Sequence, residues 1–354
     1  MRAQVKGRAS GFNTPNRFEK THLEPLDVDV DYEGDLPPRP TTFYNDTSRS
    51  ILAKNDSPDL PFAYSINPYL GCEHGCIYCY ARPSHEYLGF SAGLDFETKI
   101  MVKLDSPELL DKALQKKGWK PQMVAFSGNT DCYQPIERKL QLTRRCLAVF
   151  LKYRNPVGLI TKNALVLRDI DILQDMARLN LVHVMLSITT VDADLARVME
   201  PRTSSPANRL RAIQELAKAG ILVGVNAAPI IPGLTDEELP AILRAAADHG
   251  ATSAGYILLR LPGAVEHLFL DWLRRTLPDR ARRIINQIMD TRQGKMSDAR
   301  FGTRLNGEGE IAKAINTLFT LNARKYNLTK RWDGLSTEHF VRTRHDQLEI
   351  FDRQ

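Results

Sequence analysis

The sequence predicts an α/β fold in which helices cover a parallel β-sheet. From Phe62 onward, six short apolar runs alternate with segments of helical periodicity, which is the pattern of repeated β/α units. The runs are apolar almost throughout, as in strands buried on both faces. Such units form either an open doubly wound sheet or a partial barrel, and the local pattern does not choose between them. In both folds, ligands bind at the carboxyl ends of the strands.

Residues 1–60 precede the first predicted strand and mix Pro, Asp, Asn and Thr without sustained periodicity. The Pro37-Pro38 pair excludes a continuous helix in this segment. We therefore predict an extended N-terminal arm that wraps the rest of the chain.

The predicted core, residues 61–267, contains the alternating elements. Strands are predicted at residues 62–67, 123–128, 157–161, 182–188, 222–230 and 253–260. Helices are predicted between them, at Pro107–Lys117, Arg138–Tyr153, Asp169–Leu179, Pro206–Ala219 and Asp236–His249.

A basic helical extension is predicted for residues 268–354. It begins with an Arg-rich amphipathic segment, residues 272–290, and a second helix is predicted at Glu310–Tyr326. One face of this second helix is apolar and should pack on the core. The residues of that face are Ile311, Ile315, Leu318 and Phe319.

Composition excludes several classes of protein. The chain has 354 residues, 43% hydrophobic and 25% charged, which rules out disorder throughout, collagen and a coiled coil. The longest weakly polar stretch, Ile221–Leu234, contains an Asn and two prolines and is shorter than the roughly 20 apolar residues of a membrane helix. The first fifteen residues lack the apolar stretch of a secretory signal, so we expect cytoplasmic residence.

The positive charge is concentrated at the C-terminal end. The whole chain has 48 Lys and Arg against 42 Asp and Glu, whereas residues 274–354 have seventeen against ten. Such a segment either attracts polyanions such as nucleic acid or forms a solvated helical surface, and both interpretations stay open.

Polar residues lie in or just after the carboxyl-terminal part of five predicted strands, so we expect them to gather at one end of the sheet. Each set alone is typical of turns, but five sets at strand ends favour a shared site. They are Asn67; Ser127, Gly128, Asn129, Thr130 and Asp131; Thr161, Lys162 and Asn163; Ser187, Thr189 and Thr190; and Asn226.

Cys72, Cys76 and Cys79 lie within eight residues, in a loop after the first predicted strand. The spacing indicates a metal site, because an odd number of clustered cysteines does not suit a disulfide framework. Structural zinc sites normally have four protein ligands, as do ordinary four-iron clusters. Either His74 or Cys132 is a candidate fourth ligand, although we expect His74 to be an exposed loop residue. With three thiolates alone, one iron of a cubane stays open to an exogenous ligand.

The loop sequence NPYLGCEHGCIYCYARP resembles the signature of the radical S-adenosylmethionine (AdoMet) enzymes, in which three spaced cysteines include an aromatic residue before the last. Tyr78 occupies that aromatic position. The resemblance spans residues 62–262 and implies a partial (β/α)6 barrel of the TIM type. It also implies that Cys72, Cys76 and Cys79 hold a [4Fe-4S] cluster, whose unique iron binds AdoMet. Reductive cleavage of AdoMet then gives a 5′-deoxyadenosyl radical that abstracts hydrogen from a substrate.

The same resemblance implies roles for other residues at the strand ends. Tyr78 and Ile231, the latter in the PIIPGLTD run, match positions that contact adenine. Lys162 and Ser187 match positions that bind the AdoMet carboxylate and ribose. Asn226, in the fifth predicted strand, is a further candidate for cofactor binding. The segment Ser127, Gly128, Asn129 and Thr130 takes the place of a Gly-Gly-Glu-like segment that contacts the AdoMet amine, although it contains no Glu.

The motifs CIYCYARP, TDCYQP, LITKN and GVNAAPIIPG are similar to the subgroup that contains spore photoproduct lyase and its uncharacterised bacterial relatives. The lyases return a hydrogen atom from a cysteine near the end of strand two, where this chain has Gly128. This departure argues against simple photoproduct repair. Cys132 lies nearby as a candidate hydrogen-atom donor, with a buried structural thiol as the favoured alternative.

The predicted function is therefore a radical AdoMet enzyme with an open substrate, for which nucleic acid is the first candidate. A flavodoxin or ferredoxin is expected to supply the low-potential electron. The competing prediction is a non-catalytic zinc or iron-sulfur module that binds nucleic acid through its basic C-terminal region.

Overall fold

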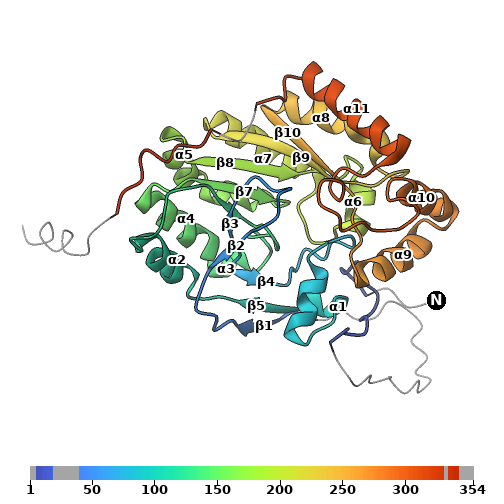
Figure 1. The fold of residues 1–354 in the computed structure, drawn as a ribbon, viewed down its shortest axis with the longest axis horizontal. Coiled ribbons are helices and arrows are strands. Elements are labelled where there is room, and N and C mark those ends of the chain that lie inside the picture. Colours follow the sequence, from blue (N-terminus) through green and yellow to red (C-terminus); the bar gives the residue numbers. More distant parts are fainter. Residues whose placement is uncertain (1–4, 19–39, 331–333, 343–354) are drawn as a thin grey trace, which may run out of the picture.

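The computed structural model describes residues 5–18, 40–330 and 334–342, and its central feature is a sheet of six consecutive parallel strands (Figure 1). The order β3-β6-β7-β8-β9-β10 follows the chain, and each neighbouring pair is parallel. All six predicted strands are confirmed. Their bounds are Tyr64–Ile66 (β3), Val124–Phe126 (β6), Val157–Thr161 (β7), Val182–Ser187 (β8), Leu222–Ile230 (β9) and Ser253–Leu258 (β10).

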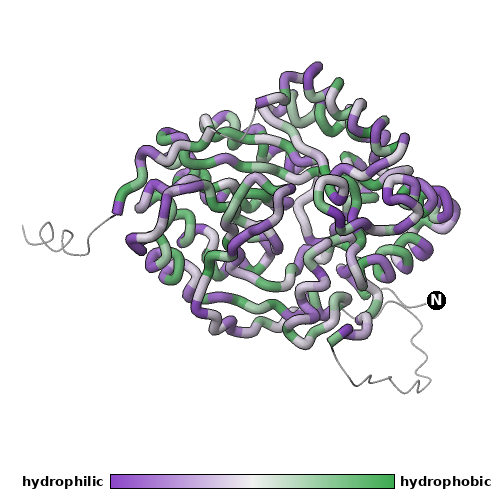
Figure 2. The backbone as a smooth tube through the Cα atoms, in the orientation of Figure 1, coloured by the Kyte–Doolittle hydropathy of each residue, from purple (hydrophilic) through white to green (hydrophobic). Residues whose placement is uncertain are grey.

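The sheet curves but does not close, which resolves the choice of fold in favour of a partial barrel. Strand β10 forms one edge, and β2 (Leu52–Lys54), antiparallel to β3, forms the other. Alternate residues of each strand, such as Val182, Val184 and Leu186 in β8, pack in one large apolar core. Figure 2 shows hydrophobic residues along the central strands and hydrophilic residues on the outer helices.

The helices between the strands cover the outer face of the sheet and largely match the predictions. The predicted helix Arg138–Tyr153 is wrong as one element, because Gln141 adopts a left-handed conformation (φ 51°) that separates two helices. The helical elements of this region are η1 (Arg82–Leu88), α1 (Leu94–Thr98), α2 (Ser106–Gln115), α3 (Glu137–Leu140), α4 (Leu142–Tyr153), η2 (Ala164–Asp169), α5 (Ile170–Arg178), α6 (Ala193–Met199), α7 (Pro206–Lys218), η3 (Asp236–Glu238) and α8 (Leu239–Asp248).

The N-terminal arm contributes strands to the fold, which its local pattern did not indicate. Besides β2, it provides β1 (Thr42–Asn45), which pairs in parallel with β5 (Lys99–Val102). Strand β4 (Tyr69–Leu70) pairs with the other side of β5 and completes a second, small sheet. Part of the predicted arm, including Pro37-Pro38, lies outside the described residues.

The basic C-terminal region contains two helices where the sequence predicts one amphipathic segment. Helices α9 (Ala264–Thr276) and α10 (Pro278–Asp290) are separated because a proline at position 278 disfavours helical geometry at the preceding Leu277. Helix α11 (Gly309–Lys325) matches the predicted second helix, and Ile315 on its apolar face is buried. In the described part of the chain, no helix combines the length and apolar character required to cross a membrane.

Candidate active site

The three clustered cysteines lie in the loop between β4 and η1, with Cys72 and Cys76 buried and Cys79 half-buried. Backbone hydrogen bonds anchor this loop on both sides: Cys72 N donates to Phe96 O (2.9 Å) and Ile77 N donates to Met199 O (3.0 Å). The turn requires a glycine before Cys76. Gly75 has φ of +65°, and a Cβ added there would lie 2.7 Å from Oε2 of the Glu97 carboxylate.

Arg82 holds the backbone of the cysteine loop in place. Its guanidinium is fully buried and donates to the carbonyl oxygens of Cys76 (2.9 Å) and Gly75 (3.1 Å). The same group forms a buried ion pair with Glu97 (2.6 Å). The N-terminal arm joins this network, because Ser10 N donates to the Glu97 carboxylate (3.2 Å). These contacts fix the backbone that carries the thiols.

His74 is not the exposed loop residue that the sequence predicts, since only 1% of its surface is accessible. Its Nδ1 lies 3.4 Å from the Asp131 carboxylate and its Nε2 lies 3.1 Å from Nδ2 of Asn163. Asn163 Oδ1 accepts hydrogen bonds from Leu165 N and Ser204 Oγ, so its Nδ2 is the donor to His74. Both ring nitrogens are therefore engaged, and His74 is excluded as a fourth metal ligand in this conformation.

Asp131 ties the cysteine loop to the ends of strands β6 and β7. Its carboxylate accepts from Thr161 Oγ1 (2.7 Å) and from Lys162 N (2.7 Å), besides the contact with His74. Burial by itself would raise the pKa of Asp131, but the hydrogen bonds from His74, Lys162 N and Thr161 Oγ1 lower it. Asp131 is therefore an ionised acceptor that connects three polar strand ends.

Tyr78 is buried, and its hydroxyl group is held by a second buried network. The hydroxyl donates to the Glu200 carboxylate and lies 3.1 Å from Thr189 Oγ1. Arg209, which is also buried, forms an ion pair with the other oxygen of Glu200 and donates to Ser187 O (2.9 Å). The ring of Tyr78 is thus fixed in orientation beside the cysteines.

Two of the predicted AdoMet-binding residues lie against Tyr78. Lys162 Nζ is 5.8 Å from the centroid of the Tyr78 ring and donates to Ala228 O (3.3 Å), so it is not a solvated loop charge. Burial lowers the pKa of Lys162, whereas the neighbouring Cys76 raises it. Ile231 is fully buried in the apolar cluster that also contains Cys76 and Tyr78.

Many polar groups of the loop after β6 form hydrogen bonds within the protein. Asn67 Oδ1 accepts from the backbone N–H groups of Asn129 (3.1 Å) and Thr130 (3.3 Å). The carbonyl of Gly128 accepts from the Tyr80 hydroxyl (2.7 Å). Ser127 has φ of +75° and its hydroxyl accepts from Cys132 N (2.7 Å). This loop reaches the cysteine loop through Tyr80.

Ser187 and Asn226 are opposite each other in the register of β8 and β9. They belong to the set of alternate residues that does not enter the helix-facing core, so they line the concave face of the barrel. Ser187 is buried, whereas Asn226 is partly accessible.

Cys132 is 1% exposed and packs with Tyr133 and Phe150 in the core between strands and helices. Burial raises the pKa of its thiol. These surroundings are those of a structural thiol, and its role as a hydrogen-atom donor stays a prediction. Cys146 is also fully buried in this core, so neither thiol belongs to the apolar clusters that contain the cysteine loop.

The donor set of the loop fits a four-iron cluster better than a single zinc ion. Within the described residues, no three Cys, His, Asp or Glu side chains converge as ligands of one metal ion do. A cubane does not need such convergence, because each cysteine binds a different iron. Burial raises the pKa of all three thiols, so a bound metal centre would be needed to hold them as thiolates.

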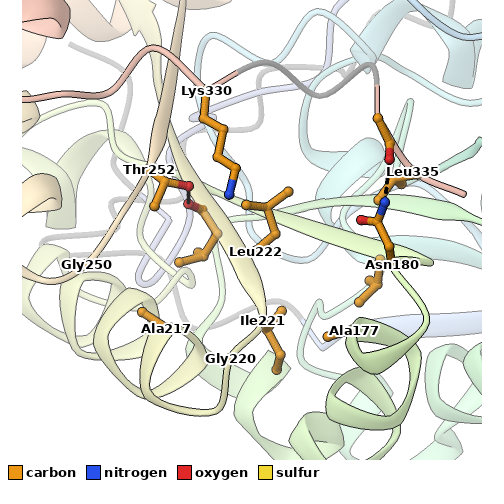
Figure 3. Close-up of a pocket in the computed structure, with 13 residues that line it drawn as sticks. Ala177, Asn180, Ala217, Gly220, Ile221, Leu222, Gly250, Thr252, Lys330 and Leu335 are labelled. Carbon is orange, nitrogen blue, oxygen red and sulfur yellow. Dashed lines mark hydrogen bonds between the residues drawn. The ribbon is translucent and has the colours of Figure 1, made fainter.

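A cavity of about 540 Å³ lies at the opposite end of the barrel (Figure 3). Its walls include Val182 and Leu222, the first residues of β8 and β9. Here the C-terminal segment crosses the amino ends of the strands: Ser336 N donates to Asn180 O (2.8 Å) and Val341 N donates to Tyr153 O (3.0 Å). Since β/α barrels carry their chemistry at the carboxyl ends, this cavity is not the active site.

Sequence reasoning missed the buried charged residues that support the site. Sequence alone does not distinguish a buried Arg from a surface one, although the position of Arg82 three residues after Cys79 was a usable signal. The supporting residues are Glu73, Arg82, Glu97, Glu200 and Arg209, all of them buried.

Comparisons with known proteins identify the family of this chain. Residues 66–246 match the family described as the Radical SAM superfamily. An uncharacterised protein of Mycobacterium tuberculosis is 36% identical over 241 residues, which are 67% of this chain and 71% of the relative. An uncharacterised protein of Methanocaldococcus jannaschii is 32% identical over 176 residues, 49% of this chain and 63% of the relative.

Solved structures of spore photoproduct lyase share the fold. A point mutant superimposes with a TM-score of 0.58 at 17% identity and covers 81% of this chain and 80% of that chain. The lyase complexed with dinucleoside spore photoproduct gives 0.56 at 18% identity, over 80% and 79% of the two chains. The chain therefore belongs to the radical SAM superfamily, and it is an enzyme whose cofactors are a [4Fe-4S] cluster and S-adenosylmethionine.

Proposed function

We propose that this enzyme cleaves AdoMet reductively and uses the resulting 5′-deoxyadenosyl radical to abstract hydrogen from a nucleic acid. The observation that carries the proposal is the cysteine loop. Cys72, Cys76 and Cys79 are the proposed cluster ligands. Of the two candidates for a fourth ligand, His74 is engaged at both ring nitrogens and Cys132 belongs to a different apolar cluster. These three cysteines would hold the cluster, which would supply the electron for AdoMet cleavage.

The proposed AdoMet site lies beside Tyr78. Lys162, next to the Tyr78 ring, is assigned to the carboxylate, and Tyr78 and Ile231, which share an apolar cluster with Cys76, are assigned to adenine. Ser187 and Asn226 face the barrel interior and are assigned to the ribose side. The residue that contacts the AdoMet amine is assigned to the segment 127–130. Asn129 is the best candidate of that segment because the Gly128 carbonyl and the Thr130 hydroxyl already have partners.

The proposal of a nucleic acid substrate is supported by the basic C-terminal region. In the described residues, Arg274 and Arg282 of helices α9 and α10 are exposed and have no carboxylate partner. Binding should therefore weaken steeply as salt is added, because phosphate contacts release counterions. A titration that detects no binding of DNA or RNA at low ionic strength would remove nucleic acid as the substrate.

The electron is proposed to come from a flavodoxin or ferredoxin, and the compartment is proposed to be the cytoplasm. Both follow from chemistry: a low-potential cluster needs a low-potential donor, and all five cysteines are free thiols, as expected in a reducing compartment. The N-terminal arm (residues 1–60) and the C-terminal extension (residues 268–354) are proposed to shape access to the core.

Anaerobic reconstitution tests the enzymatic proposal. We expect about four iron and four sulfide per chain, and formation of 5′-deoxyadenosine after addition of dithionite and AdoMet. Cys76→Ala should abolish both results, whereas the control Cys146→Ala, at a buried core cysteine, should retain them. Stoichiometric zinc without AdoMet cleavage would instead establish the non-catalytic metal-binding module.

A further inference from the structure

Arg260 is a half-buried cation at the rim of the barrel, and its Nε has no hydrogen-bond partner among the described residues. It follows β10 by two residues and so lies at the carboxyl end of the sheet, where the cysteine loop also lies. In the described part of the chain, its guanidinium makes no hydrogen bond or ion pair, and its Nε is inaccessible to solvent and unpartnered. A buried N–H without a partner is costly, so an anion that accepts from Nε would stabilise this side chain.

The neighbours of Arg260 leave a net positive charge. Arg304 is close enough for burial and its charge together to lower the pKa of Arg260. Arg304 itself is held by Asp59 in an ion pair whose side chains are largely buried. Two arginines therefore share one carboxylate. Asp59 follows β2 and Arg304 precedes α11, so this pair bridges the open side of the barrel, between the edge strands.

Tyr80 connects Arg260 to the cysteine loop. The Arg260 guanidinium carbon is 5.7 Å from the centroid of the Tyr80 ring, and Tyr80 directly follows Cys79. Residue Tyr80 is 50% exposed although its hydroxyl donates to the Gly128 carbonyl. Tyr78, by contrast, is buried and faces Glu200. The two tyrosines thus flank Cys79, and the Tyr80 side is the one accessible to a substrate.

We propose that Arg260 and Tyr80 form a subsite that binds one phosphate and the adjoining base of the nucleic acid substrate. A guanidinium presents its N–H donors in a planar fork that matches the oxygens of a phosphate. An exposed aromatic ring beside it offers a stacking surface for a base. This inference rests on the proposed function for the identity of the substrate, and it assigns Arg260 to substrate binding rather than to AdoMet.

Fluorescence anisotropy with the full-length reconstituted protein tests the subsite. The probe is a fluorescein-labelled single-stranded oligodeoxynucleotide, titrated at several salt concentrations. Arg260→Gln should raise the Kd about tenfold and reduce the salt slope by about one. Arg260→Lys should be intermediate, because it keeps the charge but loses the fork. Arg211→Gln, at an exposed arginine of α7, is the matched control and should leave binding unchanged.

A methylphosphonate oligonucleotide of the same sequence separates phosphate binding from other effects. Its backbone is neutral, so Arg260→Gln should not change its affinity. An equal loss of affinity for both probes, equal Kd values for Arg260→Gln and Arg211→Gln, or no binding by the unmodified protein at low salt would each overturn the proposal. Thermal unfolding of each variant checks that the fold is retained.

Cleavage of AdoMet by the unmodified protein separates this inference from the proposed function. If AdoMet is cleaved but Arg260→Gln binds the oligonucleotide normally, the subsite assignment fails alone. If AdoMet is not cleaved but Arg260→Gln loses phosphate-dependent binding, the proposed function fails and the binding site stands.

Discussion

Replacing Arg82 by Met should destabilise the protein and release the cluster, because this side chain stabilises the cysteine loop. Arg82 is fully buried, pairs with the equally buried Glu97, and donates to the carbonyls of Gly75 and Cys76. Breaking a buried pair by removing one partner costs about 3–5 kcal/mol, because the other charge stays uncompensated. For a chain of 354 residues, about 4 kcal/mol corresponds to a Tm decrease of about 5 °C.

Thermal unfolding of the Arg82→Met protein, together with its iron content after reconstitution, measures both effects. The control is Arg197→Met, which removes an exposed pair with Asp194 and should cost less than about 1 kcal/mol. Adding Glu97→Gln to Arg82→Met should restore part of the stability, since it removes the uncompensated charge but leaves the loop carbonyls unpaired. A Tm decrease no larger than that of Arg197→Met, with a full complement of iron, would refute this account of the loop.

Two further substitutions test the geometry around the cysteines. Gly75→Ala should reduce iron incorporation, because its Cβ would lie 2.7 Å from Glu97 Oε2 at a φ of +65°. The control Gly118→Ala has no atom within 4 Å of its added Cβ, and equal iron contents in the two variants would contradict the prediction. Tyr78→Phe should retain the cluster but weaken AdoMet binding by about tenfold, since one donor to a buried carboxylate is worth about 1–2 kcal/mol. Equilibrium dialysis against AdoMet measures this, with the exposed Tyr87→Phe as control, and an unchanged Kd for Tyr78→Phe would exclude a role for its hydroxyl.

The strands were predictable because each is an almost continuous apolar run between turn residues, and all six are present in the sheet. The partial barrel was not predictable from pattern alone, because closure depends on curvature and on pairing between distant segments. The strands of the N-terminal arm are an example: β1 pairs with β5 more than fifty residues later, and its own residues are all exposed.

The site was predictable where its chemistry is local in sequence. The spacing of Cys72, Cys76 and Cys79 identifies the loop without any tertiary information. His74 shows the limit, because its burial depends on Asp131 and Asn163, which follow two other strands. The same holds for Arg260, because the sequence shows neither its contact with Tyr80 nor that its Nε lacks a hydrogen-bond partner among the described residues.

Electron paramagnetic resonance of the dithionite-reduced protein, recorded before and after addition of AdoMet, tests the central claim most directly. The account predicts the spectrum of a reduced [4Fe-4S] cluster that changes shape when AdoMet is added, because the iron without a cysteine ligand then binds the amino acid end of AdoMet. A cluster spectrum that AdoMet leaves unchanged would contradict the account.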